Sequence, residues 1–253
     1  MTEGIFSRVE RLLGDEGVKS LSRLRVIIFG VGGVGSWCAE ALVRTGICHL
    51  TIVDADCVSI TNINRQLMAT TETIGQSKVE VLRQRLLTIN PEAEIIPVQR
   101  LFTKETASDF HLDEFDCIVD AIDSLKDKAA LILEACRTEA LFVSSMGAAL
   151  KIDPTRIRVA EFRKIEGDPL ARAIRKKFKA LGEYPSRRFL CVYSDELLQN
   201  LGADTESETD EPQLYRKAQV NGSLAHITAI FGCMLAGLIV EDSQTRKTIP
   251  LKR

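Results

Sequence analysis

The sequence predicts an α/β fold, a doubly wound and mostly parallel sheet with an α+β region appended after it. Short apolar, β-branched runs alternate with helical patterns over residues 1–150, which is the order of repeated βαβ units. A glycine-rich turn follows the first run, and the alternation stops after residue 150. We therefore expect one globular unit of 253 residues, with a core at 1–150 and an appended region at 151–253.

Five strands are expected in the core, each rich in β-branched and other apolar residues. They are Arg25–Phe29, His49–Asp54, Glu94–Val98, Cys117–Ala121 and Leu141–Ser145. The helices expected between them are Val34–Thr45, Lys78–Asn90 and Lys126–Thr138. In the second helix the apolar residues recur every three or four positions, which indicates a helix packed on the sheet.

The pattern of the appended region differs from that of the core. Strand-like runs at 157–162 and 188–194 flank a basic helix at Pro169–Leu181. Residues 201–212 are acidic and carry few large apolar side chains, so we expect a mobile loop there. A last helix is predicted from about Gly222 to Val240; its apolar part is shorter than a typical membrane span, and a buried helix is the expected outcome.

Composition narrows the functional classes. The 33 Lys and Arg residues nearly balance the 35 Asp and Glu residues, so any binding of nucleic acid must depend on a local basic patch. The seven cysteines form no C-x-x-C pair, which argues against bound zinc. Several cysteines lie in apolar runs, and the N-terminal segment is too charged for a signal peptide. We expect a reduced, cytoplasmic protein with no membrane segment.

Gly30, Gly32 and Gly35 form a G-x-G-x-x-G motif between the first predicted strand and the first predicted helix. In a Rossmann-like fold these glycines allow a tight turn, the approach of phosphates and close packing of the helix. Asp54 follows Gly35 by 19 residues at the end of the second strand, where a carboxylate accepts ribose hydroxyls. The motif predicts a nucleotide site, but NAD and ATP satisfy it equally.

The next segments favour ATP. Residues 61–66, TNINRQ, contain an arginine, which can bind phosphate oxygens through two parallel hydrogen bonds and compensate charge that develops during attack at the α-phosphorus. Lys78, at a helix start, can contact a phosphate or remain solvated. Asp123 lies just beyond the fourth strand, where it can hold Mg²⁺ or cap the following helix. Asp120 is nearer the strand interior and can cap the following loop.

Together these motifs resemble the ubiquitin-activating, ThiF/MoeB/HesA-like superfamily of adenylating enzymes. The resemblance rests on GVGGVG, DAD, TNINRQ, GQSK and DAID, in this order over about residues 5–150. It implies ATP and Mg²⁺ as cofactors, with Gly32 and Gly33 near the phosphates, Asp54 on the ribose and Asp123 on the metal. The residues implied to act on the triphosphate are Asn62, Arg65, Gln66 and Lys78.

The N-terminal RVER resembles the R-x-x-R motif of the superfamily, whose second arginine reaches into the ATP site of a neighbouring subunit. Arg11 has the matching position, and Arg8 is the lesser candidate. This resemblance implies a homodimer with shared sites. A surface amphipathic helix would also account for two arginines at this spacing.

The second half of the chain resembles the tRNA threonylcarbamoyladenosine dehydratase branch of that superfamily, through residues 153–159, 168–179, 191–196 and 221–232. The resemblance implies adenylation of a threonyl carboxylate in tRNA, closure of a ring by the neighbouring ureido oxygen, and an appended region that serves substrate binding and dimerisation. Superfamily members that charge sulfur carriers usually hold zinc in paired C-x-x-C motifs. This chain has none. Some relatives also carry a sulfur-accepting cysteine near the start of the final helix, and because the corresponding run at 217–226 has no cysteine, sulfur-relay partners are not expected. A sulfur-carrier-activating enzyme and a non-enzymatic nucleotide-binding module remain the alternatives.

A cationic face on the helix Pro169–Leu181 is the candidate surface for tRNA. Its residues, with two arginines that follow, are Arg172, Arg175, Lys176, Lys179, Arg187 and Arg188. Such a face can follow a phosphate backbone, and the resemblance to the dehydratase branch favours this interpretation over a merely solvated helix.

Overall fold

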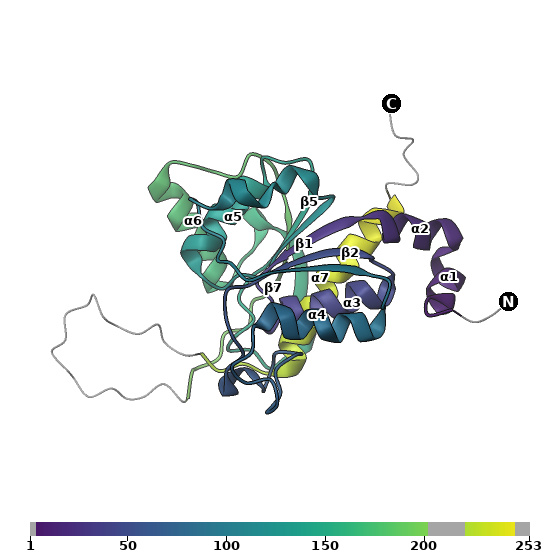
Figure 1. The fold of residues 1–253 in the computed structure, drawn as a ribbon. Helices are drawn as coiled ribbons and strands as arrows, with labels where there is room; N and C mark the ends of the chain where they lie inside the picture. Colours follow the sequence, from purple (N-terminus) through teal and green to yellow (C-terminus); the bar gives the residue numbers. More distant parts are fainter. Residues whose placement is uncertain (1–3, 202–220, 246–253) are drawn as a thin grey trace.

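Seven strands form one sheet with the order β3-β2-β1-β4-β5-β7-β6 (Figure 1). The computed structural model describes residues 4–201 and 221–245 of the chain. The strands are β1 Arg25–Phe29, β2 His49–Val53, β3 Glu94–Val98, β4 Cys117–Asp120, β5 Leu141–Ser145, β6 Ile157–Glu161 and β7 Leu190–Ser194. Neighbouring strands pair in parallel from β3 to β7, and the edge strand β6 is antiparallel to β7.

Helices cover both faces of the sheet, as a doubly wound fold requires (Figure 1). They are α1 Ser7–Leu13, α2 Asp15–Arg23, α3 Gly35–Thr45, α4 Lys78–Ile89, α5 Leu125–Ala135, α6 Pro169–Leu181 and α7 Ala225–Thr245. Single 3₁₀ turns occur at Ile60–Asn62, Ala107–Phe110, Leu112–Glu114, Pro154–Arg156 and Phe162–Lys164. Successive side chains of β1 point to opposite faces of the sheet. Val26 and Ile28 pack with α3, α4 and α7 on one face, and Ile27 and Phe29 pack with α5 and α6 on the other.

The structure confirms the predicted fold class and every strand and helix expected from the sequence. Most ends agree within three residues, but α7 continues to Thr245, five residues beyond the predicted end. The helix α1 contains the RVER run, for which a surface helix was the alternative interpretation, whereas α2 was not predicted; both are short and together bury only Gly17 and Leu21. The acidic loop predicted at 201–212 lies, apart from Leu201, outside the described residues.

The region after residue 150 continues the same sheet. Its strand β7 pairs in parallel with β5, and β6 closes the edge. By length and composition, α7 is the one helix within the described residues that could cross a membrane. It packs on α3 and β5, and residues spaced three or four apart, such as Phe231 and Leu235, are fully buried, so one face of α7 belongs to the core.

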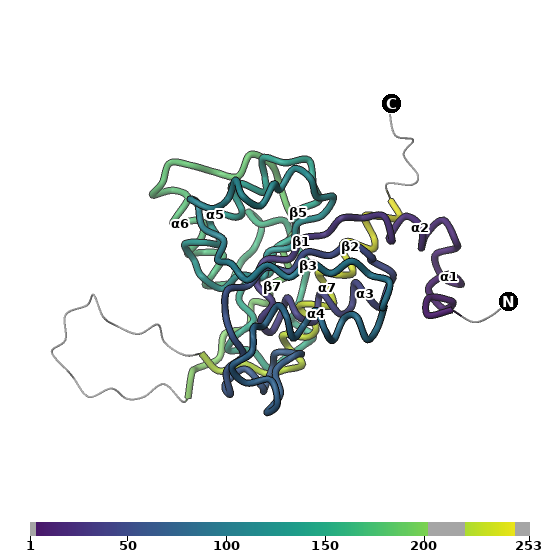
Figure 2. The backbone as a smooth tube through the Cα atoms, in the orientation of Figure 1, coloured from purple at the N-terminus to yellow at the C-terminus, as the bar shows by residue number. Residues whose placement is uncertain are grey.

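The strand order places a topological switch point between β1 and β4. From β1 the chain proceeds outward to β2 and β3, whereas from β4 it proceeds to the other edge. The backbone trace shows how the loops that leave the ends of these strands return through helices on opposite faces (Figure 2). Ligands of open α/β sheets bind at the carboxyl ends of strands at such a point.

Candidate active site

A cavity of about 690 Å³ lies at the carboxyl ends of β1 and β4. Its nucleotide side is formed by the glycine loop, the end of β2, the polar run at 61–66 and the loop after β4, and the rest of its lining includes the loop after β5 and the amino end of α6. The residues singled out in the sequence that line it are Gly30, Gly32, Gly33, Asp54, Arg65, Gln66, Lys78 and Asp123. The fold therefore brings together eight of the predicted residues, from five separate segments.

The glycine loop is shaped by two positions that exclude a side chain. Gly30 has a φ of 82°, and a Cβ at this position would lie 2.7 Å from the carbonyl oxygen of Ala121. A Cβ at Gly35 would lie 1.8 Å from the carbonyl oxygen of Gly30. Gly35 does not line the cavity but allows α3 to begin directly behind the loop, so the amino end of α3 favours an anion there.

Asp54 is held by the backbone at the end of β2. Its Oδ2 accepts a hydrogen bond of 2.9 Å from the amide of Val31, and its Oδ1 accepts one of 2.9 Å from the amide of Asp56. Burial raises the pKa of Asp54, although Lys78 and these two amides oppose the rise. The carboxylate is thus fixed in position with acceptor capacity left for hydroxyl groups.

Lys78 is only 6% exposed, so the solvated-lysine alternative does not hold. Its Nζ lies 2.7 Å from Oδ2 of Asp56 and 3.9 Å from Oδ1 of Asp54. The ammonium therefore stands beside the predicted ribose site with its charge partly balanced, and it lines the cavity from the first turn of α4.

Arg65 and Gln66 line the cavity, whereas Asn62 does not. The two hydrogen bonds that Arg65 donates, 2.8 Å to the carbonyl of Thr61 and 2.9 Å to Oδ1 of Asn64, both come from Nη1. Oε1 of Gln66 is buried without a hydrogen-bond partner among the described residues. The side-chain oxygen of Asn62 accepts the amide of Ser59 and so closes a capping box, which gives Asn62 a local structural contact.

Asp123 is exposed at the cavity and does not cap a helix. The N-cap of α5 is Ser124, whose side chain accepts the amide of Asp127. Asp120 is fully buried, 2.8 Å from Nζ of Lys128, and accepts hydrogen bonds from Ser144 and from the amide of Ile122, as a loop cap would. Lys128 also donates 2.9 Å to the Ile122 carbonyl. This buried pair fixes the loop that presents Asp123.

The structure places the predicted arginines of α1 and four of the six basic residues in or near α6 at the surface. Arg8 and Arg11 are exposed on α1 and do not line the cavity of their own chain. Arg172, Lys176, Lys179 and Arg188 are exposed as expected. Arg175 donates to the carbonyl of Phe162 and lies over its ring, and Arg187 donates to the carbonyls of Ala135 and Ala140 at the end of α5. The guanidinium groups of Arg175 and Arg187 thus have partners within the fold.

The opposite wall of the cavity was not predicted from the sequence. It consists of residues 146–151, the amino end of α6 from Asp168 to Leu170, Leu197, Asn221 and Ser223. In the sequence, Asp168 belonged only to the run 168–179 that resembles the dehydratase branch, and Pro169 was the first residue of a predicted helix. Because their place in the cavity depends on the pairing of β5 with β7, no local pattern in the sequence could reveal it.

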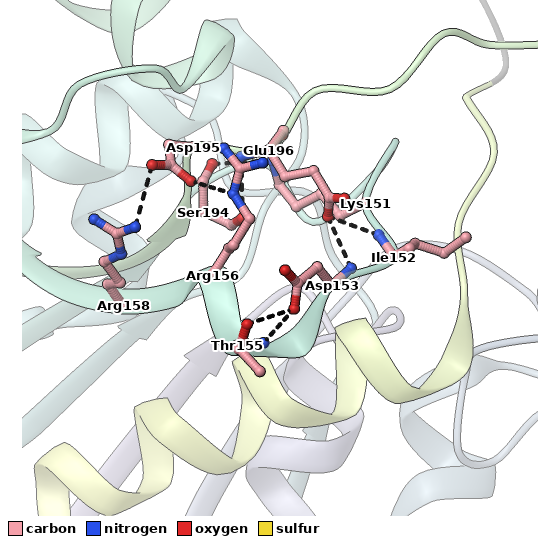
Figure 3. A network of polar contacts seen from close by, with 9 residues as sticks. All are labelled: Lys151, Ile152, Asp153, Thr155, Arg156, Arg158, Ser194, Asp195 and Glu196. Carbon is pink, nitrogen blue, oxygen red and sulfur yellow. Dashed lines mark hydrogen bonds and ion pairs between the residues drawn. The ribbon is translucent and has the colours of Figure 1, made fainter.

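Lys151 anchors this wall to the end of β7 (Figure 3). Its Nζ donates hydrogen bonds of 3.0 Å to the carbonyl of Ser194 and 2.5 Å to that of Glu196. The Glu196 carboxylate in turn accepts the amides of Ile152 and Asp153. Burial lowers the pKa of Lys151, although nearby carboxylates, first that of Asp168, oppose this. The contacts of Lys151 and Glu196 bind the loop after β5 to the segment after β7.

Comparison with known families agrees with this arrangement. The profile of the ThiF family matches residues 6–249. The chain belongs to the ThiF family. This ThiF-family chain is 37% identical to a tRNA threonylcarbamoyladenosine dehydratase of Bacillus subtilis (strain 168), over 98% of this chain and 97% of the relative.

A solved structure shows the same fold at similar coverage. The crystal structure of E. coli tRNA N6-threonylcarbamoyladenosine dehydratase in complex with ATP has a TM-score of 0.84 and 31% identity to the ThiF-family chain, over 97% of this chain and 96% of that one. The molybdopterin-synthase adenylyltransferase of Escherichia coli (strain K12) is also 31% identical, but over only 64% of this chain and 63% of the relative. The two dehydratases are therefore similar to this chain over nearly its full length, and the adenylyltransferase over about two thirds of it.

Proposed function

We propose that this ThiF-family protein is an ATP-dependent tRNA threonylcarbamoyladenosine dehydratase that adenylates the threonyl carboxylate. One observation carries the proposal: a single cavity joins the nucleotide motifs of residues 30–123 to a wall built from residues 146–151 and 168–170, Leu197, Asn221 and Ser223. Most of this wall comes from the second half of the chain, and the similarity to the Bacillus subtilis dehydratase includes that half. Such a cavity can hold a nucleotide and an acceptor carboxylate together.

The residues on the nucleotide side fit ATP. Gly32 and Gly33 line the cavity beside the amino end of α3 and have no side chains. The side-chain nitrogen Nε2 of Gln66 is close to this point, since it would lie 3.6 Å from a Cβ at Gly32. The phosphates would therefore meet backbone and amide donors. Asp54 would bind the ribose, while Arg65 and Lys78 would compensate charge on the triphosphate.

The site also fits Mg²⁺ held mainly by the nucleotide. No group of three or more His, Cys, Asp or Glu side chains that could bind a metal occurs within residues 4–201 and 221–245. Mg²⁺ in nucleotide sites often uses one or two carboxylates with phosphate oxygens and water. Asp123 is exposed at the cavity, on the loop that the buried pair of Asp120 and Lys128 holds in place. Its carboxylate would be the protein ligand of Mg²⁺.

The chemistry of the proposed reaction requires an activated acyl group and little else from the protein. A carboxylate oxygen of the threonyl group attacks the α-phosphorus of ATP, and pyrophosphate leaves. The ureido oxygen then attacks the acyl carbon, the bond to AMP breaks, and one water has formally been lost. Because the attacking group is already in the substrate, proximity supplies much of the rate acceleration, and no protein nucleophile is needed.

A homodimer and a tRNA surface complete the proposal. Arg11 lies on an exposed helix outside its own cavity, as expected of a side chain that serves the site of a partner subunit. The exposed Arg172, Lys176, Lys179 and Arg188 would contact the phosphate backbone of tRNA. The seven cysteines, all within the described residues, form no disulfide there, and a reducing, cytoplasmic compartment is part of the proposal.

The proposal is tested by incubating the protein with ATP, Mg²⁺ and tRNA that contains threonylcarbamoyladenosine. Mass spectrometry of the nucleosides should show a product lighter by one water, in amounts equal to the AMP formed. Arg65→Ala and Asp123→Ala should fold normally and lose this activity. An unchanged nucleoside mass with wild-type protein would contradict the substrate assignment. Pyrophosphate exchange stimulated by a small carrier protein with a C-terminal Gly-Gly would instead support the sulfur-carrier alternative.

A further inference from the structure

Asp168 is the buried carboxylate of the wall opposite the nucleotide motifs. The residue is 1% exposed and lines the cavity beside Gly147 and Leu170. Its Oδ1 accepts a hydrogen bond of 2.7 Å from the amide of Ala171 and so caps α6. Its Oδ2 is buried and has no hydrogen-bond partner among the described residues. One oxygen therefore accounts for the cap, and the other is unexplained.

Neighbouring groups approach Oδ2 but do not satisfy it. The amides of Gly147 and Leu170 favour the ionised carboxylate, yet neither makes a hydrogen bond of normal geometry to Oδ2. Lys151 attracts the carboxylate, but its Nζ donates to the carbonyls of Ser194 and Glu196. A buried acceptor without a partner is costly, which is why such atoms concentrate where a ligand or substrate supplies the missing donor.

Gly147 lines the cavity next to this oxygen. A Cβ at Gly147 would lie 3.5 Å from Oδ2 of Asp168, so even the smallest side chain would stand against the carboxylate. Gly147 has no positive φ that would require glycine. A methyl group at Gly147 would therefore occupy the space beside Oδ2 without straining the backbone.

We propose that Oδ2 of Asp168 accepts the ureido N–H proton of the substrate during ring closure. The inference rests on the proposed function. As the ureido oxygen bonds to the acyl carbon, the bond between that carbon and the phosphate oxygen breaks, and AMP leaves with the electron pair. The threonyl nitrogen gives its proton to Oδ2, and its N–H electrons form the carbon–nitrogen double bond of the ring. Charge and atoms balance without any further reactant.

The environment of Asp168 suits a base of this kind. Burial raises the pKa of Asp168, while the amide of Ala171 and the ammonium of Lys151 oppose the rise. A carboxylate with a raised pKa is a stronger proton acceptor than an exposed one, and general-base catalysis contributes about 10²–10⁴-fold. In this position Asp168 would act on ring closure and leave adenylation to the residues across the cavity.

The test separates the two chemical steps in single-turnover reactions with the full chain. Asp168→Asn and Asp168→Ser each keep an oxygen that can cap α6 but lose the ionised Oδ2. We expect pyrophosphate release within about threefold of wild type and ring closure slowed by at least about 100-fold. The accumulated acyl adenylate should be trapped by hydroxylamine as a hydroxamate. Gly147→Ala places a methyl group beside Oδ2 and should slow ring closure less strongly, again with little effect on pyrophosphate release.

Asp153→Asn is the matched control. Asp153 is also an N-cap, accepting the amide of Thr155, but it does not line the cavity, so both steps should keep wild-type rates. Equal loss of pyrophosphate release and ring closure in folded Asp168 variants would overturn the proposal, and so would ring closure at the wild-type rate. Absence of tRNA-dependent pyrophosphate release in the wild type would contradict the proposed function itself, and this assignment with it.

Discussion

Single atoms decide what each position of the glycine loop tolerates. At Gly35 there is no space for a side chain, because a Cβ would overlap the carbonyl oxygen of Gly30 at 1.8 Å. At Gly32 a Cβ would make an ordinary contact of 3.6 Å with Gln66, so the space is free in the protein alone. The fold therefore requires glycine at position 35, whereas at position 32 the proposed ligand requires it.

This difference predicts opposite outcomes for two alanine substitutions. Gly35→Ala should lower the melting temperature sharply or prevent folding, because backbone must move to admit the methyl group. Gly32→Ala should melt like the wild type but weaken ATP binding by at least about tenfold, since the methyl group occupies the approach of the phosphates. Calorimetric titration with ATP and thermal melts measure both. Unimpaired ATP binding by Gly32→Ala would place the phosphates elsewhere.

At the scale of elements, α7 and α3 cross at a glycine. A Cβ at Gly232 would lie 2.4 Å from the carbonyl oxygen of Val34 and 2.8 Å from the amide nitrogen of Cys38, so the two helices approach to backbone contact. Gly237, one and a half turns further along the same helix, has nothing within 4 Å of a Cβ position. This contact brings Thr228 of α7 to the cavity, beside Gly33.

Alanine substitutions at these two glycines should therefore change stability in opposite directions. Gly232→Ala is expected to lower the free energy of unfolding by about 1–3 kcal/mol, because it forces α7 away from α3. Gly237→Ala should raise it by up to about 1 kcal/mol, since alanine has the higher helix propensity. Urea denaturation of both variants measures the difference. If both changes had the same sign and size, the close contact of the two helices would be refuted.

Two consecutive arginines at the end of the basic region have different surroundings. Arg187 donates to backbone carbonyls at the end of α5, whereas Arg188 is exposed. Arg187→Ala should cost about 1–3 kcal/mol of stability, because the buried carbonyl of Ala140 loses its donor, whereas that of Ala135 keeps its hydrogen bonds from Thr138. Arg188→Ala should leave stability unchanged, weaken tRNA binding and reduce the salt dependence of binding by about one ion. Equal tRNA affinity of wild type and Arg188→Ala would remove Arg188 from the RNA surface.

On the scale of the whole molecule, the proposed dimer makes each site depend on two chains. If Arg11 serves the partner's cavity, Arg11→Ala and Arg65→Ala protein should each be inactive, yet a mixture should recover activity. In a mixed dimer, one cavity keeps its own Arg65 and receives Arg11 from the other chain. Subunit exchange followed by the dehydration assay measures this. A mixture no more active than its parts would mean that Arg11 acts within its own chain or not at all.

The sequence predicted the sheet and the nucleotide side of the cavity because their signals are local. Gly30, Asp54 and Asp123 each follow a strand-like run directly, so the parallel sheet brings them to one edge. Asp168 was missed as a cavity residue because its position depends on the pairing of β5 with β7, a long-range contact, and Lys151 was missed although it lies in the loop after β5, because no motif marks it. Asn62 shows the opposite limit: a residue within a motif lies outside the cavity in the structure and closes a local turn instead.

The central claim is that the threonyl carboxylate attacks the α-phosphorus of ATP, and an isotope label tests it most directly. Substrate tRNA carrying ¹⁸O in both carboxylate oxygens would be converted in one turnover and the AMP analysed by mass spectrometry. Adenylation predicts one ¹⁸O in the phosphate of each AMP, because the carboxylate oxygen bonded to phosphorus departs with it. Unlabelled AMP, or ¹⁸O in inorganic phosphate together with ADP, would contradict activation by adenylation.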